Sequence, residues 1–486
     1  MKSAAVGLGA VLLLLALVVA VRTLTVSPPR TSEPIAPPIA VDARLVAQHL
    51  GQAVRFRTIS YGGGAHEAEK DAELDALRGW ISRTYPYFHK AANRAVIGKS
   101  LLFTWQGKNT ALKPILLMAH MDVVPVVPDT ERSWLHAPFS GDVAGGYVWG
   151  RGAIDDKGPL ISILEAAERL ARAGFLPERT IMFAFGQDEE VGGRQGNAVI
   201  AQMLAARGTR FDFVLDEGGE ILDEPFAGVE RPVAFVAVSE KGYLSLELVA
   251  HGEGGHSSRP THDMAILRLA QAIQKVVDHP FASGLDAVQA EKLHVLAPFV
   301  PLPQRILLAN LWLTEPIVDR LIEMTPEGAA RLHTTIAPTL ISGGVKDNVL
   351  PPEARAVINF RLHPRDTIEG VIDHVRKALD DPKVDVIALN ETMNDASKVA
   401  DTHGESYRFL AAQIQKSFGI PVAPDTTTGA TDSHHYLPIS DAVFRFDPFH
   451  FGPGDLARVH GTNERLAVRE LAPAVSFYMH LIEDAR

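Results

Sequence analysis

Cysteine is absent from this chain of 486 residues. Its absence excludes a disulfide scaffold, a thiol nucleophile and a zinc site built from thiolates. A lipoprotein with an acylated cysteine is excluded for the same reason. Any metal ion bound by this protein must therefore be held by histidine and carboxylate side chains.

An excess of positive charge is also lacking, because 47 Lys and Arg residues stand against 58 Asp and Glu residues and the formal net charge is −11. This balance disfavours a protein that binds nucleic acid or an anionic membrane mainly through electrostatic attraction. The composition, with 46% hydrophobic and 22% charged residues, is otherwise typical of a soluble globular protein with room for two or three domains. We expect a small-molecule substrate and no nucleic-acid partner.

Several catalytic motifs are missing as well. The sequence contains no G-x-S-x-G nucleophile elbow, no G-x-x-x-x-G-K-[ST] phosphate loop and no H-E-x-x-H zinc helix. Gly7-Leu8-Gly9 and Gly452-Pro453-Gly454 lack the third glycine of a dinucleotide fingerprint. The chemistries that depend on these motifs find no support in the sequence.

The N-terminus departs from the average composition. Ala4 to Val21 is an uncharged apolar run, followed by Arg22, and its length approaches the roughly 20 residues that span a bilayer. We therefore expect an export signal or a single membrane anchor over residues 1–26. Residues 27–41 form a Pro-rich linker. The protein is predicted to be exported, and to be either membrane-anchored or secreted or periplasmic.

Short apolar runs alternate with helical patterns after the linker. The runs cover Pro114 to Ala119, Thr180 to Phe185 and Phe211 to Leu215, and Gly158 to Ala173 has helical spacing. Continuous apolar runs of this length are typical of strands buried on both faces of a sheet. The sequence predicts an α/β fold with a mixed, mostly parallel sheet and flanking helices.

Histidine and acidic residues follow each of these runs. His120-Met121-Asp122 follows the first, Asp188-Glu189-Glu190 the second and Asp216-Glu217 the third, while Asp155-Asp156 precedes the helix. Ligands of open α/β sheets bind at the carboxyl ends of the strands, so these groups should converge. Any one of them alone is more commonly a helix cap or a solvated loop residue. Several carboxylates at one place repel one another unless a multivalent cation neutralises them, which favours a metal site.

Six ordered blocks of sequence resemble the signature blocks of the di-zinc aminoacylase/carboxypeptidase metallopeptidases. The blocks are His120-Met121-Asp122, Gly150 to Gly158, Asp188-Glu189-Glu190, Asp216 to Gly219, Gly254 to Ser258 and His460 to Glu464. The resemblance extends from about Asp42 to Arg486. Val238 to Gly242, a long insert around Pro301 to Thr335, and Thr431-Asp432-Ser433 are most similar to the carboxypeptidase S branch of that family.

The resemblance implies two Zn²⁺ ions per chain and a set of protein ligands. The implied ligands are His120 and Asp216 for one ion, Glu190 and His460 for the other, and Asp155 as a bridge. Glu189 would be the general base and Asp122 would orient His120. By spacing alone His434, His435 or His450 competes with His460, but the block around His460 matches the family.

Residues 239–389 differ from the preceding segment. They have strand and helix patterns, but no acidic residues follow the predicted strands. They resemble the family's smaller inserted α+β lid, or dimerisation-type domain, which divides the catalytic domain into residues 42–238 and 390–486. The resemblance implies that His256 hydrogen-bonds the oxyanion and that Asn348 and Arg361 hold the substrate's carboxylate or a nearby carbonyl. Without the resemblance to the family, we would interpret His256 as a surface histidine and Arg361 as one partner of a surface salt bridge.

The loop at Thr431 and Asp432 resembles the family's substrate-carboxylate loop. His434 stands there in place of the arginine that this branch leads us to expect. Thr431 and Asp432 are therefore candidate substrate-binding residues, and the affinity of the loop for a carboxylate is an open question.

These residues predict a zinc-dependent hydrolase of an amide bond next to an amino acid with a free carboxylate. The two enzyme alternatives are a metallo-carboxypeptidase of the carboxypeptidase S type and an amidohydrolase or synthase acting on N-fatty-acyl amino acids. The insert from Phe299 to Leu340 is apolar enough for an acyl chain, although ordinary helix packing explains the same pattern. An alternative of another class is an inactive anchored binding protein on the same fold. The oligomeric state is left open.

Overall fold

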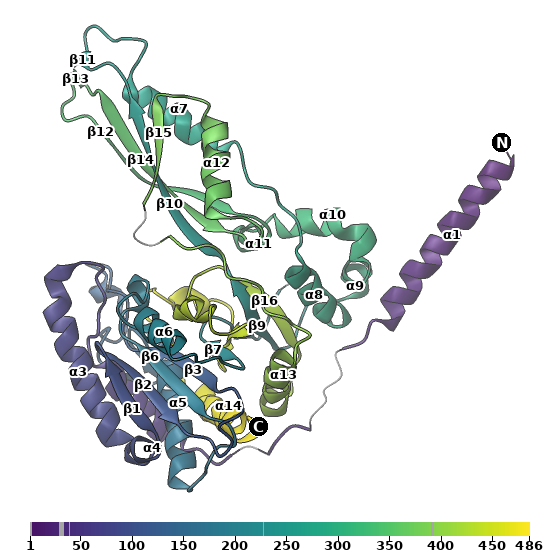
Figure 1. Cartoon of the computed structure of the whole chain (residues 1–486). Coiled ribbons are helices and arrows are strands. Elements are labelled where there is room, and N and C mark those ends of the chain that lie inside the picture. The colour runs from purple at the N-terminus through teal and green to yellow at the C-terminus, as the bar shows by residue number, and fades with distance from the viewer. Residues whose placement is uncertain (1, 29–33, 38, 227, 390–392) are drawn as a thin grey trace.

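The structure, a computed structural model, describes residues 2–28, 34–37, 39–226, 228–389 and 393–486. Figure 1 shows a body built around a large sheet, a smaller unit projecting from it, and helix α1 (Lys2–Thr25) leading away from both. Within α1, residues Val6–Thr25 are long and apolar enough to cross a membrane. Residues 29–33 and 38 of the predicted Pro-rich linker lie outside the described residues.

The large sheet is mixed, as predicted, and its central strands β6, β3, β7 and β17 run parallel. Antiparallel strands flank them on both sides, and β16 pairs with β9 off the main path. The order across the sheet is β1 (Asn93–Ile97), β2 (Ser100–Trp105), β6 (Ile181–Gly186), β3 (Ile115–His120), β7 (Val214–Asp216), β17 (Val443–Arg445), β9 (Val233–Glu240), β8 (Ile221–Leu222) and β18 (His450–Phe451), with β16 at Val422–Thr427.

Both faces of the sheet are covered, which explains why the central strands are apolar at every position. Leu117 and Phe183 pack into one hydrophobic cluster with helices α2 (Ala43–Val54), α5 (Lys157–Arg172) and α14 (Val468–Asp484). Their sequence neighbours Leu116 and Met182 point to the opposite face and pack with α6 (Asn197–Ala206). Side chains alternate along a strand, so both sets must be apolar. Three further helices complete the body, namely α3 (Glu67–Thr84), α4 (Pro86–Ala91) and α13 (Glu405–Phe418).

A small side sheet joins two distant parts of the sequence next to the large one. Strand β19 (Arg465–Ala467) pairs with β5 (Tyr147–Trp149), which pairs with β4 (Asp142–Ala144). A buried ion pair reinforces the connection, because Arg151 Nη1 lies 2.6 Å from Glu464 Oε2. The loop that carries Asp155 is thereby held against the segment that carries His460.

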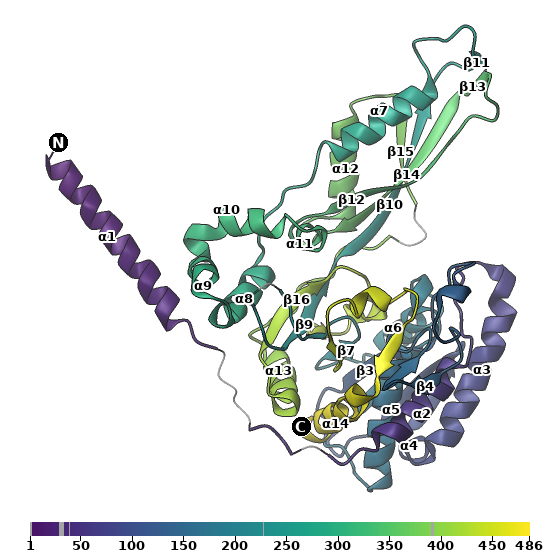
Figure 2. The same ribbon diagram turned by 180° about the vertical axis from the view of Figure 1, so that it is seen from behind.

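The projecting unit is an antiparallel sheet in the order β12 (Thr335–Gly343), β14 (Glu353–Leu362), β10 (Gly242–His251) and β15 (Val384–Ala388). Helices α7 (Ala265–Val277) and α12 (Ile368–Leu379) pack on it through one apolar cluster. At its far end β11 (Gly255–His256) pairs with β13 (Val349–Leu350), as both views show (Figures 1 and 2). The strand and helix patterns predicted within this segment are confirmed.

Four helices inside the predicted insert pack elsewhere. They are α8 (Ala287–Leu296), α9 (Leu302–Leu308), α10 (Leu311–Ile322) and α11 (Pro326–Leu332). An apolar cluster joins α8 to α10 with Phe235 of β9 and Ala423 of β16, so they cover an end of the large sheet and not the lid sheet. The domain boundaries at 239 and 389 stay a prediction, and residues 390–392 at the second boundary lie outside the described residues.

Candidate metal centre and substrate cleft

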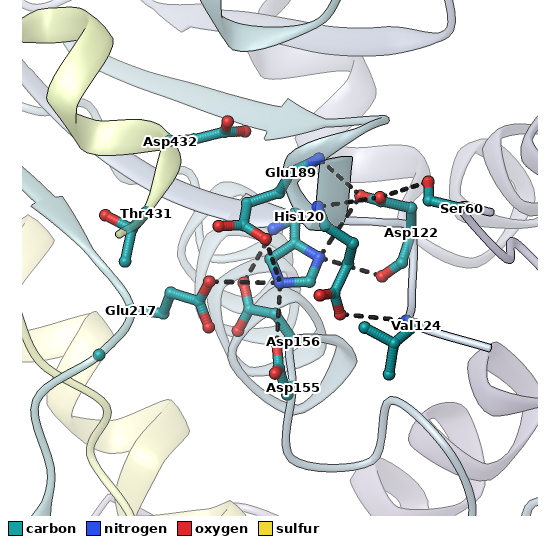
Figure 3. Close-up of polar contacts among 12 residues, drawn as sticks. Ser60, His120, Asp122, Val124, Asp155, Asp156, Glu189, Glu217, Thr431 and Asp432 are labelled. Carbon is teal, nitrogen blue, oxygen red and sulfur yellow. Dashed lines mark hydrogen bonds and ion pairs between the residues drawn. The ribbon is translucent and has the colours of Figure 1, made fainter. Parts of the chain in front are cut away.

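Residues from separate elements converge at the carboxyl ends of the parallel strands, as predicted. His120 is the last residue of β3, Glu189 and Glu190 open a short 3-10 helix after β6, and Glu217 directly follows β7. Asp155 lies in the loop before α5. Figure 3 shows the side chains of Asp155, Glu189 and Glu217 directed toward the His120 ring. The crevice outside the strand ends is where open α/β sheets bind ligands.

The His120 ring is oriented so that one nitrogen is free to bind a metal. Nδ1 lies 3.0 Å from the backbone oxygen of Asp122. A carbonyl oxygen can only accept, so Nδ1 donates to it, and Nε2 faces the site as the nitrogen that a metal ion would bind after losing its proton. Nε2 is 2.9 Å from Asp155 Oδ1 and 3.2 Å from Glu217 Oε1.

The second histidine lies on the other side of Asp155. His460 Nε2 is 2.9 Å from Asp155 Oδ2 and 3.2 Å from Glu190 Oε2. Each oxygen of the Asp155 carboxylate therefore faces a different histidine. That is the arrangement expected of a carboxylate that bridges two cations.

The Asp122 carboxylate positions the acidic pair. Its oxygens accept hydrogen bonds from the backbone nitrogens of Glu189 at 3.1 Å and Glu190 at 3.3 Å. Ser60 Oγ donates to the same carboxylate at 2.6 Å (Figure 3). Asp122 is fully buried and its Oδ1 is 3.5 Å from His120 Nδ1. One side chain thus fixes both the histidine and the two glutamates.

The electrostatics of this cluster fit a cation. Burial and the charge of Asp155 raise the pKa of Glu217 to about 8 and that of Glu190 to about 7. Hydrogen bonds to Asp155 and Glu190 raise the pKa of His460 to about 10. Crowded carboxylates that retain protons would ionise readily beside a divalent ion. Imidazole nitrogens and carboxylate oxygens, with no sulfur, suit zinc.

A cleft of about 590 Å³ opens beside this cluster. Asp155, Glu189 and His460 line one part of its wall, and Tyr243 and Arg361 of the lid line another. The Arg361 guanidinium lies 4.6 Å from the centre of the Tyr243 ring. Among the described residues no carboxylate pairs with Arg361, so its charge is available to a ligand. The lid therefore contributes to the cleft near the base of its long strands.

A family model for peptidase family M20/M25/M40 matches residues 116–484. The chain belongs to this family. It is therefore an enzyme of the peptidase and amidohydrolase type, and the resemblance drawn from the six sequence blocks is confirmed. Membership in the M20/M25/M40 family also implies a metal ion, for which the residues around His120 are the candidate ligands.

Similar proteins cover nearly the whole chain. The "probable carboxypeptidase S-like 2" of Dictyostelium discoideum is 38% identical over 447 residues, which is 90% of this chain and 85% of the relative. The N-fatty-acyl-amino acid synthase/hydrolase of Xenopus tropicalis is 35% identical over 458 residues, or 91% and 86% of the two chains. Among solved structures, an M20 family metallo-carboxypeptidase from Sulfolobus solfataricus is 17% identical with a TM-score of 0.66, covering 91% of this chain and 99% of that one. The predicted fold class is confirmed.

Asp216, which belongs to the implied ligand set, does not face the metal centre in the structure. Asp216, the last residue of β7, is buried and its Oδ2 accepts a hydrogen bond from the Ser433 nitrogen at 2.8 Å. The next residue, Glu217, points the opposite way and reaches His120. Adjacent side chains at a strand end face opposite directions, so only one of the pair can enter the site. The sequence shows that Asp216 and Glu217 are adjacent, but it does not show which of the two side chains faces the site.

His256 and Asn348 are not in the cleft of their own chain. Both lie beyond the far end of the lid, where the Ser257 nitrogen donates to the Asn348 oxygen at 3.1 Å. Arg361 is paired with Tyr243 near the base of the ten-residue strand β10, and His256 follows the other end of that strand. Ten residues of strand span roughly 30 Å, which separates these two parts of the predicted site. His256 therefore lies away from the cleft of its own chain, and its role at the oxyanion stays a prediction.

Thr431 and Asp432 line the cleft, and each has a polar side-chain atom with a partner inside the protein, while Asp432 Oδ1 has no hydrogen-bond partner among the described residues. Thr431 Oγ1 is 3.2 Å from Glu240 Oε2, and Asp432 Oδ2 accepts from Asn197 Nδ2 at 2.6 Å. Both residues shape the wall, and their roles in substrate binding stay a prediction.

The structure distinguishes among the four histidines that are candidate metal ligands by spacing. His434 and His435 line the cleft next to Thr431, and burial lowers the pKa of His435 to about 4. His450 Nδ1 is paired with Asp223 Oδ1 at 2.8 Å. His460 is the histidine that lies against Asp155 and Glu190.

Proposed function

We propose that this protein is a two-zinc hydrolase of an amide bond next to an amino acid whose carboxylate is free. The observation that carries the proposal is the Asp155 carboxylate, with one oxygen toward His120 and the other toward His460. Glu217 would complete the ligands on the His120 side, and Glu190 those on the His460 side. In this set Glu217 takes the place first given to Asp216.

Bound zinc would polarise the scissile carbonyl and acidify water. Glu189 is the residue that moves the proton: its carboxylate takes a proton from the attacking water and returns it to the leaving amine. The Asp122 hydrogen bond to the Glu189 nitrogen holds this residue in place. Burial raises the pKa of Glu189 well above its usual range, which suits a group that must carry a proton between two steps.

Arg361 would bind the free carboxylate of the substrate. Its guanidinium is half-buried in the cleft wall, stacks on Tyr243 and has no acidic partner among the described residues. A planar guanidinium can donate two parallel hydrogen bonds to a carboxylate. This contact would select acids over amides at the product side of the scissile bond.

Two substrate classes fit the same machinery. One is a peptide with a free C-terminus, in agreement with the name of the Dictyostelium relative, and the other is an N-fatty-acyl amino acid, in agreement with that of the Xenopus relative. An apolar cavity next to the cleft favours the second class and is described below. We further propose that α1 anchors the enzyme on the exported side of a membrane, where lipid-like substrates collect.

The proposal is tested by release of amine from a matched panel of dipeptides and N-acyl amino acids, with and without chelator, on enzyme whose zinc content is measured. Two zinc ions per chain and chelator-sensitive turnover are expected. Asp155→Ala should lose both ions, because one carboxylate serves both sites. Absence of turnover on the whole panel by zinc-loaded protein would favour an inactive binding protein instead.

If His256 acts on substrate, it does so in the cleft of a second copy of this chain. The edge strand β12 favours such pairing, since Leu340 and Ile341 on it are 67% and 70% exposed. Exposed apolar edge strands are sites where a second chain adds to a sheet. Asn348 lies beside His256 at the same tip and would enter the partner's cleft with it.

A further inference from the structure

A second large cavity lies between the helices of the insert and an end of the large sheet. Its volume is about 650 Å³ and it is enclosed by α8, α9, α10 and strand β9. Its wall is mostly apolar, with Leu222, Phe235, Leu293, Leu296, Leu308 and Val318 among the lining residues. We call it the apolar chamber. A mostly apolar cavity of this kind favours a hydrocarbon over a polar ligand.

The chamber and the catalytic cleft both share walls with a third cavity between them. A small cavity of about 90 Å³ shares Gly218 and Thr427 with the cleft, and it shares Phe235 and Arg331 with the chamber. Gly218 follows Glu217 of the metal centre, and Leu222 of the chamber comes five residues after Glu217. Five extended residues span about 16 Å. The metal centre and the chamber thus lie at the two ends of one short segment.

Arg331 and Asp425 line both the connecting cavity and the chamber, and Lys292 lines the chamber. Asp425 accepts hydrogen bonds from Gln289 at 3.0 Å, Lys292 at 2.8 Å and Arg331 at 2.7 Å. The cations are therefore engaged with a buried carboxylate and are not free to attract an anion. A passage this small admits an unbranched chain more easily than a peptide with its side chains.

The position of α1 indicates where the occupant comes from. Arg22 Nε donates to the Ala309 oxygen at 3.2 Å, and Asn310 Nδ2 donates to Thr23 Oγ1 at 3.0 Å. These bonds hold the end of the apolar helix against the turn between α9 and α10, where Figure 1 shows α1 leaving the body. Leu321, which lines the chamber, is 51% exposed, so the chamber opens on the outer surface of α10. An amphiphile dissolved in a bilayer spanned by α1 would be concentrated beside this opening.

We propose that the apolar chamber binds the hydrocarbon chain of an N-fatty-acyl amino acid whose amide lies in the catalytic cleft. This inference rests on the proposed function, which places the amide at the metal centre and the carboxylate at Arg361. The acyl chain runs from the centre past Gly218 and through the connecting cavity into the chamber. The selectivity of the enzyme for acyl-chain length is then determined by contacts with α8, α9 and α10, and not by the lid.

The location is tested on the full chain in nanodiscs with N-hexadecanoyl-leucine that carries a photoreactive diazirine at the end of its acyl chain. Labelled peptides are expected from residues 287–322, and excess N-hexadecanoyl-leucine should prevent labelling whereas N-acetyl-leucine should not. Labelling confined to α1 or the lid would overturn the inference. This outcome does not depend on hydrolysis, so it is distinct from failure of the proposed function.

Kinetics provide the second test, with kcat/KM measured for N-acyl leucines from acetyl to hexadecanoyl. Leu321→Trp at the opening and Val318→Phe inside the chamber should each lower the hexadecanoyl value by at least about 10-fold and leave the acetyl value unchanged. Leu313→Trp is the matched control, because Leu313 is on the same helix and 46% exposed but does not line the chamber. If kcat/KM rises with acyl length to the same extent in all folded variants, the inference is refuted.

Discussion

Asp155 lies between two histidines, with Oδ1 2.9 Å from His120 Nε2 and Oδ2 2.9 Å from His460 Nε2. The histidines come from distant parts of the sequence, and β19 pairing with β5 brings the second one into place. Bonds to both histidines lower the pKa of the Asp155 carboxyl although burial opposes this. The carboxylate is therefore ionised and positioned before any cation binds.

Glu189→Gln should retain the wild-type zinc content and lower kcat by about 10²-fold or more, because it removes proton transfer but no ligand. Zinc is measured by elemental analysis and turnover by amine release. Glu253→Gln, on the exposed part of the lid, is the matched control. Near-normal turnover by zinc-loaded Glu189→Gln would refute the assignment of the base.

Glu217→Ala and Asp216→Asn distinguish the two candidates for the ligand beside His120. Glu217→Ala should lower zinc content, since its carboxylate is 3.2 Å from His120 Nε2. Asp216→Asn should keep the metal and change stability little, because the amide oxygen can still accept the hydrogen bond from the Ser433 nitrogen. Zinc content and thermal unfolding are measured together. The reverse pattern would restore Asp216 as the ligand.

Arg361→Ala should raise KM by about 10-fold or more for substrates with a free carboxylate, because it removes a charge-assisted contact. It should also abolish the preference for acids over C-terminally amidated analogues. Arg361→Lys keeps the charge but loses the planar fork, so it should recover only part of the preference. An unchanged acid-to-amide ratio would move carboxylate binding to the loop at Thr431.

In the chain without metal, the stability contributed by Glu217 and His460 should fall as pH rises from 6 to 9. The folded chain holds protons at Glu217 up to a pKa of about 8, against an ordinary value of 4.5, and at His460 up to about 10, against 6.5. In both cases the folded state binds more protons than the unfolded state, so the free energy of unfolding falls with rising pH. Thermal unfolding in chelator should show this, and bound zinc should flatten the curve. Burial lowers the pKa values of Lys157 and Lys241 to about 7, which acts in the opposite direction but equally in both variants. The stability of the wild type relative to Glu217→Gln should therefore fall over this range, and a constant difference would contradict the prediction.

His256→Ala and Glu189→Gln should complement each other if the tip of the lid acts in a second copy. In a mixed dimer, one cleft has an intact Glu189 and receives an intact His256 from the other chain. Co-expression should therefore recover part of the activity that each variant lacks alone. Co-expression of Glu189→Gln with Asp155→Ala is the control that should recover none, because both defects lie in the same cleft.

Much of the fold could be predicted because burial on both faces leaves a clear signal. The run from Ile115 to His120 is apolar at each position before the histidine, and β3 occupies those residues. The convergence of His120 with Glu190 could also be predicted, since carboxyl ends of parallel strands share one edge.

The remaining features depend on information that the local pattern does not contain. Whether Asp216 or Glu217 faces the site depends on where β7 ends, and a shift of one residue exchanges them. The distance of His256 from the cleft depends on how far β10 and β14 project. The packing of α8 to α10 on β9 follows from their partners, because an amphipathic helix does not specify which apolar surface will cover it.

The antiparallel pairing of β19 with β5 sets the order in which the enzyme can mature. His460 is the last of the proposed ligands to leave the ribosome, and Glu464, which anchors Arg151 and the Asp155 loop, comes four residues later. When synthesis has reached Arg458, the strands of the large sheet and the lid are present, but the metal centre is still incomplete. Amide hydrolysis therefore requires that synthesis of the chain has passed Glu464.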